Sequence, residues 1–257
     1  MRRLLYYLYE RHLLQQVLDL PVPRHVGIIL DGNRRYAQQR GLTESHEIYS
    51  LGAQKLDDVL DWCDELRIPA LTLWVCSTEN LQRSPKEVSG ILAAIEEKVR
   101  ALTADPDIHH RRIRVRAAGK LGLLPDSTAA VIRDAEQATA GYNAMTLTIA
   151  VAYDGREEIA DAVRSLIRDK TKDCGRLGDI AEQITPETIA RYLYAPDLPD
   201  PDLIIRTSGE IRLSGFLLWQ SAYSEFYFSD VYWPQFRKID FFRAVRAYQQ
   251  RQRRFGR

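Results

Sequence analysis

The sequence predicts an α/β fold: a single domain with a mostly parallel central sheet covered by helices on both faces. Short apolar runs alternate along the chain with helical segments of ten or more residues, and this alternation is typical of parallel strands joined by crossover helices. The 257 residues are 45% hydrophobic and 28% charged. This composition supports one large core and excludes a disordered chain.

Six apolar runs are the predicted strands. HVGIIL stops abruptly at an Asp-Gly-Asn turn, ALTLWVC stops at a second polar loop, and MTLTIAVAY is a long apolar run. Such continuous runs favour strands buried on both faces, whereas the alternation of IRVRAAG favours a half-buried or edge strand. In chain order, the predicted strands cover residues 25–30, 70–76, 113–119, 145–153, 202–208 and 225–228.

The segments between the strands have helical periodicity, with apolar residues at three- and four-residue steps. Pro85 opens one helix at a position that tolerates proline, and Asp126 or Ser127 caps another. The predicted helices cover residues 47–66, 85–102, 126–140, 156–168 and 240–254, and a short helix starts at Thr185. The most linker-like stretch is residues 170–178.

Residues 1–24 are predicted to form an amphipathic helical extension ahead of the main domain, residues 25–257. The uninterrupted apolar run covers only Leu4 to Tyr9, and no small-residue cleavage site follows it, which argues against a signal peptide. No stretch approaches the ~20 apolar residues of a membrane span. We expect this helix to pack on the protein or on a partner subunit, with peripheral contact to a bilayer as the alternative.

The charges are balanced overall but unevenly spread. The 36 basic and 35 acidic residues leave a net charge of +1, which argues against a nucleic-acid-binding protein. Six arginines lie in residues 243–257, where no acidic residue occurs. On composition alone, this tail is a solvated terminal helix whose long side chains cover the core.

The three cysteines indicate neither a disulfide framework nor a zinc site. Cys63, Cys76 and Cys174 are odd in number and have no CxxC spacing and no histidine at metal-site spacing. We therefore expect a reducing, cytoplasmic compartment.

Three polar loops follow predicted strands: DGNRRY (31–36), STENLQR (77–83) and RTSGEIRLS (206–214). Ligands of open α/β sheets bind at the carboxyl ends of strands, so we expect these loops to form one cleft. Asp31 with Arg34 and Arg35 suits an oxyanion bound together with a divalent cation, because Gly32 exposes backbone N–H groups beside the guanidinium groups. The alternative is a plain turn with solvated arginines.

The third loop also has the chemistry of an anion site. Arg206, Arg212, Ser208 and Ser214 suit a multiply charged ligand, although a surface loop with Glu210 paired to Arg212 is the alternative. Neither GxxxxGK[ST] nor GxGxxG occurs, which makes a nucleotide the weaker candidate. The apolar segments LTLWV, MTLTIAV and GFLLW are either core or the wall of a pocket for a hydrophobic chain. Together these features suggest a lipid-like diphosphate as the ligand.

These motifs resemble the cis-prenyltransferase (undecaprenyl diphosphate synthase-like) family over residues 25–257. The matching segments are HVGIILDGNRRYA (25–37), STENLQRSPKEV (77–88), AYDGREEI (152–159), DPDLIIRTSGEIRLSGFLLWQSAYSEFYF (200–228), WPQF (233–236) and RRFG (253–256). The resemblance implies a homodimeric, Mg²⁺-dependent transferase. It would condense isopentenyl diphosphate head to tail with an allylic prenyl diphosphate, forming a Z double bond and releasing pyrophosphate.

The resemblance also implies roles for individual residues. Asp31 would bind Mg²⁺ and assist departure of the allylic diphosphate, and Glu225 would be a second metal-associated carboxylate. Ser77 and Asn80 would handle the proton lost from isopentenyl diphosphate, which makes Asp31, Ser77 and Asn80 the catalytic candidates. The substrate-binding candidates are Gly32, Asn33, Arg34, Arg35, Tyr36, Ser77, Thr78, Glu79, Leu81, Arg83, Arg206, Arg212, Leu213 and Ser214.

The C-terminal tail takes on a different role under this resemblance. Arg254 and Gly256 resemble an RxG element that reaches across the dimer interface to the diphosphate site of the neighbouring subunit. We therefore expect a cross-subunit contribution instead of a solvated helix.

The chain departs from the long-chain pattern in ways that predict a short product. The departures are Arg34 for Gly, Tyr36 and Leu81 for Trp, Tyr49 for His and Gly215 for Asn. With RLSGFLLWQSAYSE, they resemble the actinobacterial branch that makes Z,E-farnesyl diphosphate. Val75, bulky where long-chain enzymes often have Ala, is expected to shorten the product tunnel. We expect a C15 product.

Three alternatives remain open at the level of the sequence. The first is a long-chain (C50–C55) polyprenyl diphosphate synthase for a carrier lipid, and the second is a terpene diphosphate hydrolase or synthase on the same scaffold. The third is a non-catalytic regulatory subunit or diphosphate-binding module. Retention of both carboxylates and of the Ser77–Asn80 pair argues against the third.

Overall fold

The structure, a computed structural model, describes residues 2–172 and 177–251. In these residues one sheet contains six strands in the order β3-β4-β2-β1-β5-β6, and every neighbouring pair is parallel, as the alternating pattern predicts. The strands are β1 (His25–Ile29), β2 (Ala70–Ser77), β3 (Ile113–Ala118), β4 (Met145–Tyr153), β5 (Leu203–Arg206) and β6 (Glu225–Phe228).

The helices follow the predicted segments with three additions. The helices are α1 (Arg2–Leu18), α2 (Asn33–Arg40), α3 (Ser45–Glu65), α4 (Pro85–Ala104), α5 (Pro106–His110), α6 (Asp126–Thr139), α7 (Gly155–Lys172), α8 (Leu177–Glu182), α9 (Pro186–Ala190) and α10 (Lys238–Gln250). Helices α2, α5 and α8 are absent from the predicted set. The latter two have only five and six residues, too short for a periodic signal. Helix α7 also continues to Lys172, into the stretch expected to be a linker.

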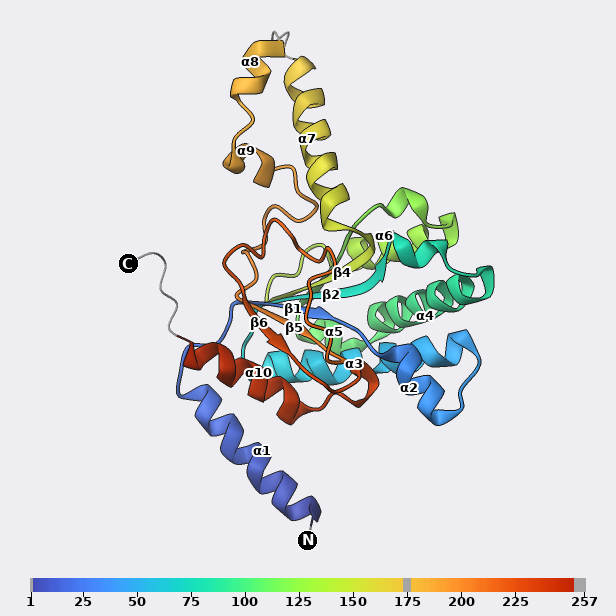
Figure 1. The fold of residues 1–257 in the computed structure, drawn as a ribbon, viewed down its shortest axis with the longest axis vertical. Helices are drawn as coiled ribbons and strands as arrows, with labels where there is room; N and C mark the ends of the chain where they lie inside the picture. The colour runs from blue at the N-terminus through green and yellow to red at the C-terminus, as the bar shows by residue number, and fades with distance from the viewer. Residues whose placement is uncertain (1, 173–176, 252–257) are drawn as a thin grey trace.

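Alternating side chains give the sheet two buried faces, as the period of a strand requires. On β2, Leu71 and Leu73 belong to the large core that contains buried residues of α3, α4, α6 and α10. Trp74 packs instead on a second cluster that includes Tyr153 and Phe216. Figure 1 shows α3, α4 and α10 beside the strands and α7 projecting from the end of β4.

The N-terminal helix is attached by its second half. Leu13 and Val17 are fully buried, and α1 packs against α10, whereas Leu4, Leu5 and Leu8 are more than half exposed. Figure 1 shows this first half extending from the body of the protein. Among the described residues, no helix has both the length and the apolar character needed to cross a membrane.

Part of the arginine-rich tail belongs to the fold of its own chain. Three of its arginines form hydrogen bonds within the chain: Arg243 with Tyr9, Arg246 with Gln16, and Arg251 with Glu225. Arg254 and Gly256, the residues expected to reach a neighbouring subunit, lie outside the described residues.

We predict that the contact between α1 and α10 contributes to global stability. Leu13→Ala should lower the free energy of unfolding by about 2–5 kcal/mol, because it removes a fully buried side chain and leaves a cavity. Leu8→Ala on the same helix is the matched control, since Leu8 is 53% exposed, and should change stability by less than about 0.5 kcal/mol. Denaturant unfolding measures both; equal effects would contradict the packing described here.

Candidate active site

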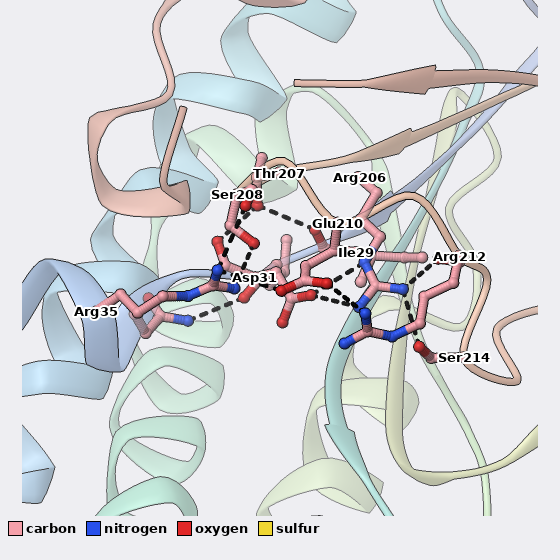
Figure 2. Close-up of polar contacts among 11 residues, drawn as sticks. Ile29, Asp31, Arg35, Arg206, Thr207, Ser208, Glu210, Arg212 and Ser214 are labelled. Atoms are coloured by element: carbon pink, nitrogen blue, oxygen red, sulfur yellow. Dashed lines mark hydrogen bonds and ion pairs between the residues drawn. The ribbon is translucent and has the colours of Figure 1, made fainter. Parts of the chain in front are cut away.

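The three polar loops meet at the carboxyl edge of the sheet, as expected. β1 lies between β2 and β5, and Ile29 at its end pairs with Trp74 on one side and Arg206 on the other. The chain reaches Asp31 two residues later. Figure 2 shows Asp31 between Arg35 on one side and Arg206 on the other.

Asp31 and Arg206 form the central ion pair of this edge. The Nε and Nη2 atoms of Arg206 donate to Oδ2 of Asp31 over 3.0 and 2.6 Å, and Nη1 donates to Ser214 Oγ over 2.9 Å and to the carbonyl of Arg212. The Arg206 side chain is 4% exposed and that of Asp31 is 36% exposed. The guanidinium is therefore a buried structural charge, whereas the carboxylate is open to a ligand.

The backbone around Asp31 is also held in place. Its carbonyl oxygen accepts hydrogen bonds from Thr207 Oγ1 (2.7 Å) and from the backbone N–H of Trp233 (2.9 Å). These bonds tie the end of β1 to the segments that follow β5 and β6. The position of the carboxylate is thus set from three parts of the chain.

The segment after Asp31 is a helix and not the loop that the sequence predicts. Gly32 has φ +103° and precedes the first turn of α2; a Cβ there would lie 2.7 Å from a ring carbon of Tyr232. Only glycine fits this turn, which places Asn33, Arg34 and Arg35 in the first turn of α2. The N–H groups of a first helical turn have no hydrogen-bond partners within the helix, so they favour the binding of an anion at this end of the helix.

Arg35 connects α2 to the loop after β5. Its guanidinium donates to Ser208 Oγ (2.7 Å) and to Glu210 (3.3 Å), and it lies 5.6 Å from the ring centroid of Tyr232. Glu210 also pairs with Arg212, as the surface-loop alternative expects. Both residues of that ion pair also line a polar pocket that contains Asp31 and Arg206.

A second cluster joins α3, α4 and the loop after β2. The Tyr49 hydroxyl donates to Glu87 Oε1 over 2.7 Å, and Arg83 donates to both Glu87 (2.8 Å) and the Tyr49 oxygen (3.1 Å). Nη1 of Arg34 lies 3.6 Å from Oε1 of Glu87. Burial raises the pKa of Glu87, but the Tyr49 hydrogen bond and the charges of Arg83 and Arg34 outweigh it and lower the pKa below 4.5. Glu87 is therefore an ionised anchor for two arginines.

Ser77 and Asn80 form a reciprocal pair. Asn80 Oδ1 accepts from the Ser77 N–H, and Ser77 Oγ accepts from the Asn80 N–H, each over 3.1 Å. Asn80 therefore has its amide NH₂ group left to offer, which is a donor and not a base. Ser77 keeps a hydroxyl proton and one further acceptor position, so of the two side chains only that of Ser77 has the chemistry to relay a proton.

Three adjoining pockets surround these residues. One polar pocket, of about 540 Å³, contains Asp31, Gly32, Arg34, Arg35 and Arg83. A second, of about 1290 Å³, shares Asp31 and all three arginines and adds Arg206, Arg212 and Ser214. The first also shares Leu30, Asn33, Tyr49 and Val75 with an apolar cavity between α3, α4 and the sheet. The site thus has two adjoining polar pockets lined by arginines and one apolar cavity.

Some predicted site residues lie elsewhere. Tyr36 stacks on Arg40, Leu81 borders a groove beside α4 and α6, and Leu213 packs on the second core cluster. Thr78 precedes a 3₁₀ turn and lines none of the three pockets, although its neighbour Glu79 does.

Glu225 is likewise separated from Asp31. It starts β6, opposite Leu203 at the amino end of β5, and pairs with Arg251. Asp31 follows the carboxyl ends of the strands, so Glu225 of the same chain lies at the opposite edge of the sheet. One chain does not bring the two proposed metal carboxylates together.

Comparison with known proteins identifies the family to which this chain belongs. The prenyltransferase family model described as undecaprenyl diphosphate synthase matches residues 29–256. The chain belongs to this family. It is therefore a prenyl-transferring enzyme of the cis-prenyltransferase type, and both the family and the fold predicted from the motifs are confirmed.

Relatives within the undecaprenyl diphosphate synthase family differ in the products that their names state. The chain is 53% identical to an isoprenyl transferase of Deinococcus radiodurans, with 96% of this chain and 90% of that protein covered. It is 52% identical to a geranylgeranyl-diphosphate-specific tritrans,polycis-undecaprenyl-diphosphate synthase of Methanopyrus kandleri (98% and 91% covered). It is 50% identical to a (2Z,6E)-farnesyl diphosphate synthase of Thermobifida fusca (98% and 97% covered).

A solved structure of this family matches the fold closely. Lavandulyl diphosphate synthase from Lavandula x intermedia, in complex with dimethylallyl diphosphate, superposes with a TM-score of 0.83 at 33% identity. The match covers 92% of this chain and 99% of that structure.

The residues at the carboxyl edge fit Mg²⁺ held jointly with a diphosphate. The described residues contain no group of three His, Cys, Asp or Glu side chains that could hold a metal alone. Mg²⁺, however, is usually held by one or two carboxylates together with substrate phosphates and water. Asp31 has the chemistry of such a carboxylate: its Oδ2 accepts hydrogen bonds from Arg206, and its side chain is 36% exposed.

The structure adds site residues that the sequence analysis missed. Thr207 fixes the Asp31 carbonyl, and Glu87 anchors Arg34 and Arg83. Both lie inside the matched segments. Nothing in their spacing distinguishes them from helix-surface or loop residues, because their partners are distant in the sequence.

We predict that Tyr49→Phe raises the pKa of Glu87 toward 4.5. The change keeps the ring and removes the hydroxyl that stabilises the ionised carboxylate. A lowered carboxyl pKa stabilises the folded protein above the ordinary value, and this contribution is lost as the pH falls through the folded pKa. In the variant, this contribution should therefore be smaller, and its loss should be complete at a higher pH.

Carbon-13 NMR titration of the Glu87 carboxyl measures the shift directly. Tyr142→Phe is the matched control, because the Tyr142 hydroxyl contacts His109 and not this cluster. An unchanged or lower pKa in Tyr49→Phe would show that the hydroxyl does not set the charge of Glu87.

Proposed function

We propose that the protein is a Mg²⁺-dependent short-chain cis-prenyltransferase whose main product is C15 Z,E-farnesyl diphosphate. It would condense isopentenyl diphosphate with a short allylic diphosphate such as geranyl diphosphate. The observation that carries this proposal is the pair of cationic pockets that share Asp31, of which one opens into an apolar cavity. Two diphosphate substrates need two adjoining anion sites, and one growing hydrocarbon needs a single apolar cavity.

The pocket at the amino end of α2 suits the allylic substrate, because it shares its wall with the apolar cavity. Negative charge grows on the allylic diphosphate as its carbon–oxygen bond breaks. The first-turn N–H groups of α2, together with Arg34 and Arg35, lie where this charge develops and need no rearrangement to stabilise it. Mg²⁺ bound at Asp31 would supply further positive charge on the leaving diphosphate.

The pocket that contains Arg206, Arg212 and Ser214 suits isopentenyl diphosphate. The Arg206 guanidinium already donates hydrogen bonds to Asp31 and Ser214, so it would act chiefly as a fixed positive charge. Arg212 and Ser214 are exposed and can donate hydrogen bonds to the diphosphate. Holding both diphosphates beside Asp31 aligns the reacting carbons, which can be worth about 7–11 kcal/mol. A diphosphate oxygen then accepts the proton lost when the new double bond forms, either directly or through the Ser77 hydroxyl, which passes its own proton on to that oxygen.

The dimensions of the apolar cavity support a short product. On α4, the residues that line the cavity run from Ile91 to Val99, eight positions, about 12 Å at the rise of a helix. An isoprene unit adds four chain bonds, about 5 Å when extended. Two to three units therefore fill this depth, which favours C15 over a chain several times longer.

A long-chain polyprenyl product is the second candidate. The Methanopyrus kandleri relative, named as an undecaprenyl diphosphate synthase, is as similar to this chain as the short-chain relative. Val75 lines the mouth of the cavity and not its far end, so its expected role in shortening the product would be to narrow the entrance.

A product assay tests the proposal. Purified protein with geranyl diphosphate, labelled isopentenyl diphosphate and Mg²⁺ should yield C15 as the main product by mass. Asp31→Asn is the inactive control and should lower the rate by about 10²-fold or more. Main products longer than C20 would overturn the short-chain assignment, and release of the unextended alcohol would favour a hydrolase.

We also propose that the protein acts as a homodimer in which Arg254 and Gly256 complete the diphosphate site of the neighbouring subunit. Deletion of residues 253–257 should abolish most activity while the circular dichroism and the unfolding midpoint stay unchanged. Deletion of residues 1–5 is the control, because the described part of that segment is exposed. Full activity of the C-terminal truncation would rule out the cross-subunit role.

A further inference from the structure

The side of the sheet that faces away from the large core has a row of buried polar side chains. His25 of β1, Thr72 of β2 and Thr148 of β4 are each at most 3% exposed. The residues that follow them in the strands belong to the large core, so the alternation of a strand turns these three to the other side. Thr72 and Thr148 are direct partners across the β2–β4 pair, which makes their side chains neighbours.

These three residues line a small cavity of about 20 Å³. Its wall also contains Glu158 of α7 and Gln220, which lies in the segment after Ser214. Half of the residues in the wall are therefore polar, unlike those of the apolar cavity on the other side of the sheet.

Two buried polar atoms of this wall lack a hydrogen bond. Among the described residues, neither Thr148 Oγ1 nor Gln220 Oε1 has a partner. A buried polar group without a partner costs free energy comparable to a lost hydrogen bond. Two such atoms at one cavity indicate a ligand that hydrogen-bonds to both.

The neighbour of Thr148 cannot supply this bond. His25 Nδ1 lies 2.6 Å from the carbonyl oxygen of Pro199, which can only accept, so Nδ1 carries the ring proton. Burial lowers the pKa of His25 and favours the neutral ring, whose Nε2 accepts from the Thr72 hydroxyl over 2.8 Å. The single hydroxyl proton of Thr72 is thus already used.

The orientation of the Gln220 amide is fixed by Glu158. Gln220 Nε2 donates to both oxygens of the Glu158 carboxylate, over 3.1 and 3.2 Å. The same carboxylate also accepts from the Tyr153 hydroxyl and the Tyr194 N–H. A reversed amide would place Oε1 against these oxygens, so Oε1 stays on the other side and needs a donor.

A water molecule has the donor and acceptor groups that this cavity requires. It can accept from the Thr148 hydroxyl and donate to Gln220 Oε1, and its second hydrogen can meet Thr72 Oγ1 or the Glu158 carboxylate. Buried waters make about three hydrogen bonds and need a cavity of about 10–15 Å³. The cavity of about 20 Å³ therefore has room for one.

We propose that one buried water molecule binds in this cavity and bridges Thr148 Oγ1 and Gln220 Oε1. It is part of the fold, and it connects β4 to the segment after Ser214, a residue of the second polar pocket. This inference does not depend on the proposed substrates or on the product length.

The direction of a stability change in the full-length protein tests the water. Thr148→Val keeps the shape of the side chain and removes the hydroxyl. If the water is bound, the variant deprives it of a partner and should raise the equilibrium constant of unfolding by about fivefold or more. In a dry cavity the wild-type hydroxyl would be unpaired, so valine would lower this constant. Denaturant unfolding measures it, and a lowered or unchanged constant would overturn the proposal.

Thr146→Val is the matched control. Thr146 lies on the same strand and side of the sheet but does not line the cavity, so this variant should change the constant by about twofold or less.

A high-resolution crystal structure of the wild-type protein provides the direct test. One peak of electron density should lie within about 3.2 Å of both Thr148 Oγ1 and Gln220 Oε1. A cavity without density would overturn the proposal. A peak with six or more oxygen ligands at about 2.3–2.6 Å would also overturn it, because it would identify a cation such as Ca²⁺.

Discussion

The buried ion pair between Arg206 and Asp31 is the contact on which the rest of the site depends. Arg206 ends β5 and is 4% exposed, so its charge is tolerable only with a close partner. The same guanidinium holds Ser214 and the Arg212 carbonyl, which shapes the whole loop after β5. Replacing the Asp31 side chain with an uncharged one would therefore remove the exposed carboxylate and leave the buried Arg206 cation unpaired.

The geometry of the sheet explains why two pockets share this carboxylate. β1 lies between β2 and β5, and the chain leaves it through Gly32 directly into α2. The amino end of α2 therefore faces one pocket, while the loop after β5 borders the other. A single residue at this position can act on both diphosphates of a condensation, which suits a reaction in which one leaves and the other stays.

The apolar cavity follows from the same alternation that builds the core. Leu73 and Val75 of β2 face α3 and α4, and the small residues Gly52, Ala53 and Ala94 leave space between these helices. Larger side chains there would close the space as ordinary core. The cavity is thus a region of core left unfilled, with the Arg34–Arg83–Glu87 cluster near its mouth and Lys98 in its lining.

By itself, the sequence determined the parallel sheet, the order of strands and helices, and the meeting of three polar loops. These follow from periodicity and from a topological rule, because parallel strands end at a common edge. Only the tertiary structure decided which side chains of those loops share a pocket. Leu81 and Leu213 lie within the motifs but face other clusters, and Glu225 lies at the opposite edge of the sheet.

The tertiary structure also decided that Asn33–Arg40 is helical, that Glu87 anchors two arginines, and that Lys98 meets Asp57. These contacts join residues that are far apart in the chain and depend on how helices pack. Local patterns show the period of each helix, but they do not show which partner each side chain meets.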